Sequence, residues 1–357
     1  MPVIGPVHRR DASDGPMGST TAINKAASAD HQEPLARAFQ RALEAAAEYE
    51  GATAPNPPVG CVLLDIDGNE LAKAAHRRAG ECHAEASAIA LALQAGVLDR
   101  IHTVIVTLEP CDHHGRTPPC TDAILTTPAR EVWIGVKDPN ASVLGHGAEK
   151  LRAAGIAIRY WDELAHPDTI ILKNSAERLI APFRKLSRLG MPWLTVKQAV
   201  TANGSMIPPP GQKTFTSSSS LILAHKLRRR ADAIVTGSGT VLADAPEFTV
   251  RHVPDFPGKR RKLIILDRRS RVPSDYLNAA TQRGFVVLIG DSLDEALRRL
   301  ADAGALEVLL EAGPSLTQTV LNSSLWDEHY LIEQTATPGG EDRVTIRHPS
   351  PSTSSSY

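Results

Sequence analysis

The stretch EPCDHHGRTPPC, residues 109–120, decides how the first half of the chain folds. It holds two cysteines nine positions apart, each directly after a proline. The preceding run TVIVTLE is rich in β-branched residues and predicts a buried strand. The following run TDAILTT predicts a short helix. We therefore expect Cys111 at the end of a strand and Cys120 at the start of a helix.

A second motif, HAE at residues 83–85, opens the helical pattern HAEASAIALALQAG. Zinc binds cysteine sulfur and histidine nitrogen, and a catalytic zinc site uses three protein ligands and keeps one open position. His83, Cys111 and Cys120 supply such a set. Glu85 could lie near the metal without binding it, and could pass a proton from zinc-activated water to a leaving amine. This H-x-E and Pro-Cys pattern is typical of zinc nucleobase deaminases, although the spacer between the cysteines is longer here.

Ordinary structural roles are the alternative for each of these residues. A single H-x-E on a helix is usually surface, and two cysteines are usually part of a core. A closed structural zinc site would need a fourth ligand, and His113 or His114 could serve, but Glu85 would then have no role. We expect Cys61 and Cys82 to be structural residues that take no part in the chemistry.

Length and composition limit the class of protein. The chain has 357 residues, which suggests about two domains. Its formal net charge of −1 gives no basic excess to attract nucleic acid, and no apolar run is long enough to span a membrane. Residues 1–33 lack an export signal and predict a disordered extension, as residues 341–357 predict a disordered tail. We therefore expect a cytoplasmic protein whose cysteines stay reduced.

Strand-like and helix-like runs alternate along the chain, which predicts an α/β fold with layered sheets. A first series of such runs ends near residue 183, and a second begins near Trp193. The segment between them, residues 184–192, is basic and contains glycine and proline. We take it as the linker between a zinc-binding domain at 34–183 and a second domain at 193–340.

At these motifs the first half resembles the bifunctional riboflavin-biosynthesis deaminase/reductase family. The matching stretches lie within residues 35–158 and read PNPPVGCV, HRRAGECHAE, TLEPCDHHGRTPPCTDAI and GVKDPNASVLGHGAEKLRAAGI. The GRTPPC spacer separates this family from the cytidine, tRNA-adenosine and guanine deaminases. The resemblance implies a cytidine-deaminase-like α/β/α layered domain. It also implies hydrolytic deamination of 2,5-diamino-6-(5-phosphoribosylamino)pyrimidin-4-one to 5-amino-6-(5-phosphoribosylamino)uracil.

The resemblance also assigns roles to residues of this domain. His83, Cys111 and Cys120 would bind one zinc ion per chain, and Glu85 would carry the proton. The residues that would contact the phosphorylated pyrimidine substrate are Asn56, His76, Arg116, Lys137, Asp138 and Asn140. Two positions depart from the family pattern, because Cys82 stands where proline is usual and Asp112 where serine is usual. Neither change removes a ligand.

The second half resembles the reductase of the same family, which has a dihydrofolate-reductase-like α/β fold and uses NADPH to reduce the ribose of the deaminated product. The matching stretches are LRRRADAIVTGSGTVLADAPEFTVR and LEVLLEAGPSL. The positions that would bind substrate or cofactor are Arg228, Thr240, Asp244, Arg251, Glu311 and Gly313. The glycines in GSGT and EAGPS would allow backbone to approach phosphate.

Several departures weaken the resemblance in this half. The family's SLDG is TANG at residues 201–204, its Ser-x-Trp aligns with Lys-Thr-Phe at 213–215, and Arg268 replaces a small polar residue. Few residues follow WDEHYLIEQ, so we expect an incomplete sheet. The interpretation is a deaminase with a reductase-like domain of doubtful activity that serves as a homodimer scaffold. A riboflavin-related or pyrimidotriazine pathway would suit such an enzyme.

Three other functions fit parts of the pattern. A fully bifunctional enzyme would also reduce the product with NADPH, and NADPH would then raise its thermal midpoint. A nucleic-acid editing deaminase would need a basic, aromatic surface, but aromatic residues make up only 4% of the chain. A non-catalytic zinc-stabilised binding module would keep its function when Glu85 is replaced.

Overall fold

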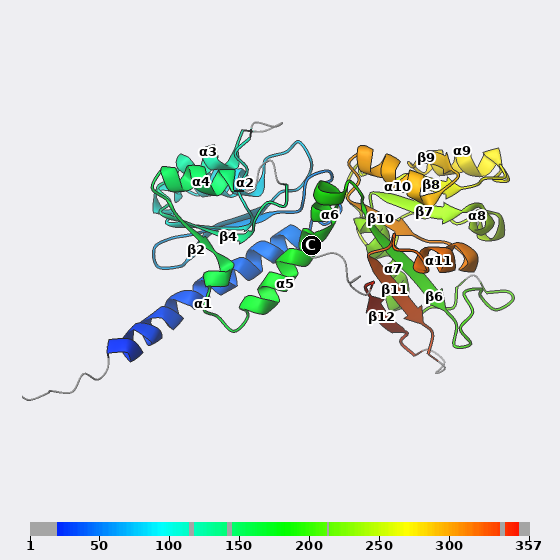
Figure 1. Ribbon diagram of the computed structural model, residues 1–357, viewed down its shortest axis with the longest axis horizontal. Coiled ribbons are helices and arrows are strands. Elements are labelled where there is room, and N and C mark those ends of the chain that lie inside the picture. The colour runs from blue at the N-terminus through cyan, green and yellow to red at the C-terminus, as the bar shows by residue number, and fades with distance from the viewer. Residues whose placement is uncertain (1–19, 114–117, 141–144, 213, 336–339, 350–357) are drawn as a thin grey trace, which may run out of the picture.

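The computed structural model describes residues 20–113, 118–140, 145–212, 214–335 and 340–349, with the backbone alone for residues 20–31. Two α/β units lie next to each other along the long axis of the molecule, each with its own sheet (Figure 1). The chain passes from one to the other through α5 (Thr169–Leu179) and α6 (Ala181–Leu189). The layered α/β fold predicted for both halves is confirmed.

The first sheet has five strands in the order β2-β1-β3-β4-β5. Its strands are β1 (Gly60–Leu64), β2 (Glu70–Ala75), β3 (Thr103–Leu108), β4 (Glu131–Val136) and β5 (Ala157–Tyr160). β1 is antiparallel to both β2 and β3, whereas β3, β4 and β5 run parallel. The carboxyl ends of the parallel strands therefore meet at one edge, where Cys111 follows β3.

Helices cover both faces of this sheet, because residues on its strands alternate between two apolar clusters. Val62 and Leu64 face α1 and α5, whereas Cys61 and Leu63 face α2 and α4. The helical elements of this unit are α1 (Thr20–Ala47), α2 (Ala84–Gln94), α3 (Cys120–Leu125), α4 (His146–Ala153), and the short 3-10 helices η1 (Leu98–Arg100) and η2 (Trp161–Glu163). Cys61 is fully buried, as predicted for a core residue.

The second sheet has seven strands in the order β12-β11-β6-β10-β7-β8-β9, all parallel except β12. Its strands are β6 (Trp193–Val200), β7 (Ala233–Gly237), β8 (Lys262–Leu266), β9 (Val286–Gly290), β10 (Glu307–Leu310), β11 (Glu328–Glu333) and β12 (Arg343–Arg347). The chain adds strands toward both edges of this sheet: β7, β8 and β9 follow one another on one side of β10, and β6, β11 and β12 on the other. Such sheets place ligands beyond the carboxyl ends of their strands.

Helices again cover both faces of the second sheet. The helices are α7 (Ser218–Arg230), α8 (Ser238–Asp244), α9 (Ser274–Gln282), α10 (Leu293–Asp302) and α11 (Pro314–Leu321). One apolar cluster contains residues of α10 and α11, and the other contains residues of α7, α8 and α9. No helix in the described part of the chain is both long enough and apolar enough to cross a bilayer.

The structure differs from the sequence-based expectations near both ends and at the linker. Helix α1 begins at Thr20, so residues 20–33 of the predicted extension are helical, as their high alanine content favours; residues 1–19 lie outside the described part. The predicted tail contains β12, whose central residues are all β-branched and which pairs with β11, so the second sheet does not end at β11. Most of the predicted linker is the second half of α6.

Candidate active site

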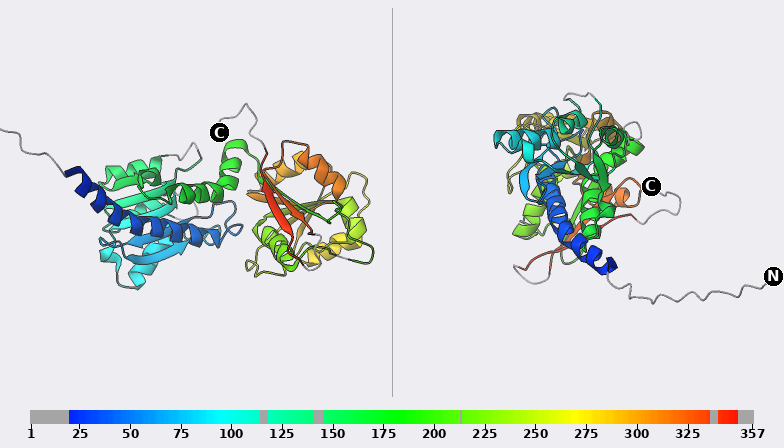
Figure 2. Two further views of the ribbon diagram at one scale, coloured as in Figure 1. Left: turned by 90° about the horizontal axis from the view of Figure 1, so that it is seen from below. Right: turned by 90° about the vertical axis from the view of Figure 1, so that its left-hand side faces the viewer.

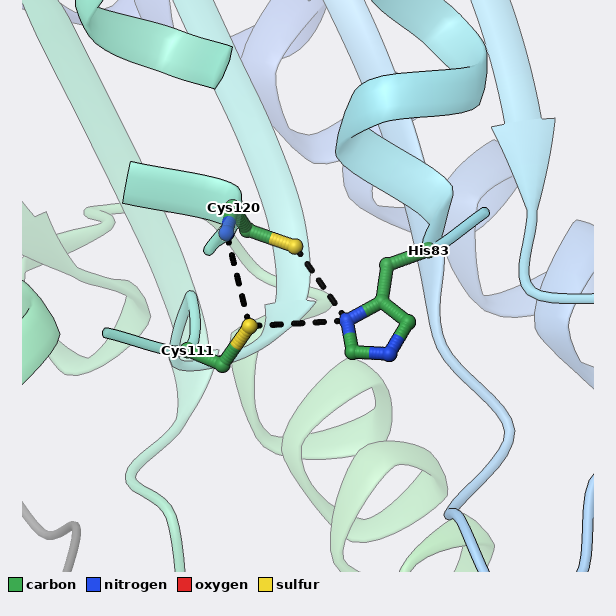
Figure 3. Close-up of side chains that lie close together, drawn as sticks. All are labelled: His83, Cys111 and Cys120. Atoms are coloured by element: carbon green, nitrogen blue, oxygen red, sulfur yellow. Dashed lines mark hydrogen bonds between the residues drawn. The ribbon is translucent and has the colours of Figure 1, made fainter. Parts of the chain in front are cut away.

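Three elements that are distant in the sequence bring His83, Cys111 and Cys120 together (Figure 3). His83 is the N-cap residue of α2, Cys111 follows the end of β3, and Cys120 is the first residue of α3. Gly147 lets α4 pack against the same region, because a Cβ atom there would lie 1.9 Å from the carbonyl oxygen of Pro110. The predicted positions of both cysteines are confirmed.

The spacing of the three side chains fits a zinc ion. Nδ1 of His83 lies 3.5 Å from Sγ of Cys111 and 3.3 Å from Sγ of Cys120. Tetrahedral zinc with its usual bond lengths holds sulfur and nitrogen ligands roughly 3.5 Å apart. In the described part of the chain these three residues form the group able to hold a metal, and His113 is not part of it. His114 lies outside the described residues.

The electrostatics favour a thiolate at Cys111. Hydrogen bonding with Cys120, assisted by the His83 imidazole, lowers the pKa of Cys111 to about 4. The backbone N–H of Cys120 also donates to Cys111 Sγ over 3.4 Å. The hydrogen bond with Cys111 raises the pKa of His83 and also that of Cys120, whose burial acts in the same direction. All four cysteines of the chain are free in the structure.

Glu85 lies against this group on the first turn of α2. The residue is 3% exposed, and its Oε2 accepts a hydrogen bond from Cys120 Sγ over 3.3 Å. Burial, followed by the charge on Cys111, raises the pKa of the Glu85 carboxyl. A carboxyl group with a raised pKa next to a metal site is able to take up and release a proton.

Asn56 and His76 form the adjoining wall of the site. Asn56 Nδ2 donates to His76 Nε2 over 3.2 Å, and His76 Nδ1 donates to the carbonyl oxygen of Cys82 over 3.1 Å. The imidazole rings of His76 and His83 meet edge to face, with their centroids 5.0 Å apart. Two predicted substrate residues therefore lie directly beside a predicted metal ligand.

Three of the four remaining predicted substrate residues follow β4. Asp138 is partly buried, and that burial raises its pKa, with charges on Glu109 and Cys111 nearby. The backbone N–H of Asn140 donates to Asp138 Oδ1 over 2.8 Å. Lys137 is exposed and its ammonium lies 4.9 Å from the centre of the Tyr160 ring. Arg116 lies outside the described residues.

Sequence reasoning missed the residues that hold these loops in place. Glu109 is buried, and its carboxylate accepts the backbone N–H groups of Asp138 and Ala148, each over 3.3 Å. It therefore ties the loop after β4 and the start of α4 to the end of β3. One feature of the sequence indicates this role: Glu109 lies at a strand end next to the Pro-Cys motif. A carboxylate at such a position is rarely buried unless it has hydrogen-bonding partners.

Comparisons with known proteins agree with this arrangement. Residues 32–136 match the profile of the cytidine and deoxycytidylate deaminase zinc-binding region, and residues 192–354 match that of the RibD C-terminal domain. The chain is 34% identical to the riboflavin biosynthesis protein RibD of Aquifex aeolicus over 309 residues, which cover 80% of this chain and 83% of that protein. The chain belongs to the RibD family. It is 32% identical to the Escherichia coli RibD over 321 residues, covering 81% and 84% of the two chains.

Solved structures of RibD proteins share the arrangement of both domains. Acinetobacter baumannii RibD superposes with a TM-score of 0.72 at 30% identity, covering 86% of this chain and 88% of that one. A Thermotoga maritima deaminase/reductase gives a TM-score of 0.73 at 29% identity, covering 87% and 89%. The chain is therefore a multifunctional enzyme of riboflavin biosynthesis, with a zinc-binding deaminase domain and a RibD reductase domain of the type that uses NADPH.

The RibD reductase domain contains a large cavity at the carboxyl ends of its central strands. The cavity measures about 1670 Å³. It is lined by all six positions that the resemblance assigned, namely Arg228, Thr240, Asp244, Arg251, Glu311 and Gly313. Thr240 Oγ1 accepts the backbone N–H of Gly313 over 2.8 Å, which joins the two glycine-containing turns.

A buried ion cluster forms the floor of this cavity. Glu311 receives Nε and Nη2 of Arg228 over 2.5 and 2.8 Å, and Lys197 Nζ lies 3.2 Å from its Oε2. Burial alone would raise the pKa of Glu311, but Lys197 and Arg228 outweigh it and lower the value to about 2. Sequence reasoning missed Lys197 and also His225, whose Nδ1 accepts the backbone N–H of Arg251 over 2.9 Å. Neither residue belongs to a recognisable motif.

Proposed function

We propose that the first domain hydrolyses the 2-amino group of 2,5-diamino-6-(5-phosphoribosylamino)pyrimidin-4-one and releases ammonia. The support is the placement of His83, Cys111 and Cys120 at ligand distance with Glu85 in contact. The A. baumannii and T. maritima structures come from proteins of the same two-domain family. When zinc is bound by these three residues, it lowers the pKa of a water molecule and makes it a nucleophile near neutral pH.

In this mechanism Glu85 carries the protons. Its carboxylate takes a proton from the attacking water and later donates it to the leaving amine, so the group returns to its starting state after each turnover. Burial raises the pKa of Glu85 and brings it nearer to the range in which both transfers are efficient. The His83 imidazole and the hydrogen bond from Cys120 act in the opposite direction, but burial outweighs them.

The neighbouring residues would position the substrate. Asn56 and His76 are coupled by a hydrogen bond at the wall next to the metal ligands, where they can hold the pyrimidine ring. We propose Asp138, Lys137, Asn140 and Arg116 as contacts to the ribose and phosphate. For Lys137, Asp138 and Asn140 the support is the position of the loop after β4 on the same side of the sheet as Cys111, whereas Arg116 is proposed from the family resemblance alone.

The single observation that carries this proposal is Glu85 buried against a three-residue metal group. The test is ammonia release from the diaminopyrimidine phosphate by the zinc-loaded wild type, by Glu85→Gln and by the exposed control Glu44→Gln. We expect Glu85→Gln to lose roughly 10²- to 10⁴-fold in rate while it retains zinc. The control should match the wild type. Full activity of Glu85→Gln would refute the role of the carboxyl group.

We further infer that the second domain reduces the ribose of the deaminated product with NADPH. β12 extends the sheet, which removes one of the two sequence-based reasons for doubting activity. The cavity supports the inference, because Gly237, Ser238, Arg268, Arg269 and Arg271 line one end of it. Glycine turns and arginines together are suited to the phosphates of a dinucleotide.

NADPH oxidation in the presence of the deaminated phosphate tests this second activity. The expected result is substrate-dependent oxidation and a product with two additional hydrogens. NADPH should also raise the thermal midpoint of the free enzyme by mass action. A protein that neither oxidises nor binds NADPH would restore the scaffold interpretation, in which a riboflavin-related or pyrimidotriazine pathway uses the deaminated intermediate directly.

We propose that the catalytic domains divide at residues 184–192 and that the enzyme is a homodimer. The edge strand β12 supports the second proposal, since Val344 and Ile346 are 42% and 46% exposed on it. An exposed apolar edge strand tends to be covered by a partner. Light scattering that gives the mass of a single chain at working concentration would contradict the dimer.

A further inference from the structure

The second domain touches both deaminase loops that carry Asn56 and His76. The first loop, residues 48–56, continues from the C-terminal end of α1, which points toward the second domain (Figure 2). The other loop, residues 76–83, joins β2 to α2 and ends at His83. One segment of the second domain, residues 255–259, contacts both loops. We call it the docking segment.

Lys259 connects the docking segment to the first loop. Its ammonium donates to the carbonyl oxygen of Gly51 and also, over 3.0 Å, to that of Arg230 in its own domain. Its carboxylate partner Asp232 lies 3.3 Å away, and the Lys259 side chain is only 11% exposed. A buried ammonium has few alternative partners, so this contact fixes the Gly51 carbonyl group.

Three further contacts hold the first loop. Nη2 of Arg229 donates to the carbonyl oxygen of Glu48 over 3.0 Å, at the end of α1 where helix carbonyls lack partners. Gly51 has φ +82°, and a Cβ atom on it would lie 2.0 Å from the carbonyl oxygen of Arg230. A Cβ atom on Gly304 would likewise meet Pro55 at 3.0 Å. The two backbones are therefore in direct contact.

The second loop is held by the same docking segment. Arg78 donates from Nη2 to the carbonyl oxygen of Pro257. The neighbouring Phe256 ring lies 3.8 Å below the guanidinium of Arg229, which also holds the first loop. One short segment thus links both loops, although residues 57–75 separate them in the sequence.

The contacts continue from this interface to the metal group. The backbone N–H of Asn56 donates to the carbonyl oxygen of Thr53 over 2.9 Å, which closes a turn within the first loop. Asn56 then donates to His76, and His76 donates to the carbonyl oxygen of Cys82, next to His83. A displacement of either loop would change the distance between Asn56 and His76.

We propose that Lys259 and Arg229 of the reductase domain are positioning residues for the deaminase site. Through the docking segment they hold the Asn56 and His76 loops at the spacing that the pyrimidine needs. The expected effect on catalysis rests on the proposed deaminase function. The physical contact itself can be tested without catalysis.

The experiment compares zinc-loaded Lys259→Met and Arg229→Met with the wild type and with Lys226→Met, an exposed lysine on α7. We expect the KM for deamination to rise roughly 5- to 30-fold in the interface variants, with kcat and zinc content unchanged. Lys259→Arg should restore much of the loss. The rate of NADPH oxidation should not change, because neither residue lines the reductase cavity.

Hydrogen exchange of the same zinc-loaded proteins gives a readout independent of catalysis. Amides of residues 51–56 and 77–82 should exchange faster in both interface variants than in the wild type and Lys226→Met. Unchanged exchange together with an unchanged KM would overturn the inference. If the wild type does not deaminate, the proposed function fails, while the exchange result still decides the positioning contact. Arg229→Met provides the same decision if Lys259→Met does not fold.

Discussion

Glu85 and Glu311 are both buried carboxylates, yet their pKa values shift in opposite directions. Burial dominates at Glu85 and raises its pKa, whereas Lys197 and Arg228 lower that of Glu311 to about 2. Glu85 is therefore suited to exchange protons, and Glu311 to remain charged and hold two cations in place. The sequence alone indicated Glu85 through its motif, but the opposite shifts depend on neighbours from distant strands and helices.

Glu311→Gln should lower the free energy of unfolding by about 3–5 kcal/mol near pH 7, because Lys197 and Arg228 would stay buried without a counter-charge. The folded pKa of about 2 lies below the ordinary 4.5, so the carboxylate contributes fully above pH 4.5 and loses its contribution as pH falls toward 2. Denaturant unfolding of both proteins from pH 7 to pH 3 measures this. If the two proteins differ in free energy of unfolding by the same amount at pH 3 as at pH 7, the Glu311 charge does not stabilise the ion cluster.

At the scale of elements, side-chain contacts connect the two ends of the spacer between the cysteines. Asp112 Oδ1 accepts Thr121 Oγ1 over 2.8 Å and Lys150 Nζ over 2.6 Å. Lys150 also reaches Asp122 Oδ1 over 2.7 Å. These contacts join the residues next to Cys111 and Cys120 to α4. Asp112 departs from the serine usual in the family, and Lys150 gives that acidic side chain a partner.

Lys150→Met should weaken zinc binding by about tenfold, because residues that orient metal ligands commonly have effects of that size. Competition with a metal-binding dye measures the affinity, and Lys173→Met, an exposed lysine on α5, is the matched control. The backbone fold should persist, since Lys150 is partly exposed. Equal zinc affinity in the two variants would show that the ends of the spacer are held by other contacts.

Most strands and helices were predictable from local patterns, but the contacts between them were not. The run at 103–109 indicated β3 because β-branched residues fill a buried parallel strand, and the proline-cysteine pairs indicated where the metal group lies. Glu109 acts by accepting a hydrogen bond from the loop after β4. Lys197 acts through the neighbouring strand β10, which pairs with its own strand β6. β12 was missed because its β-branched run is only three residues long, 344–346, and lies in a tail rich in serine and proline.

At the scale of the whole molecule, two catalytic units share one chain and one interface. The metal group belongs to the first sheet and the NADPH-type cavity to the second, so each chemistry has its own set of residues. The docking segment links the units through backbone carbonyls rather than through either reaction centre. The two activities should therefore respond differently to loss of metal.

Removal of zinc by a chelator should abolish deamination and leave NADPH oxidation with the deaminated phosphate largely intact. Zinc restored at about a thousand times its dissociation constant should return about 4 kcal/mol of stability to the deaminase domain. Parallel assays of the two reactions on one chelated sample measure this. Equal loss of both activities would show that the reductase domain depends on the metal group for its structure.

The most direct test of the account is mass analysis of the product formed from the diaminopyrimidine phosphate in water enriched in heavy oxygen. We predict that the zinc-loaded wild type replaces one amino group by one solvent oxygen and releases an equal amount of ammonia, and that Glu85→Gln does neither. Substrate recovered unchanged from the zinc-loaded wild type, or product without solvent oxygen, would contradict hydrolytic deamination at the His83, Cys111 and Cys120 site.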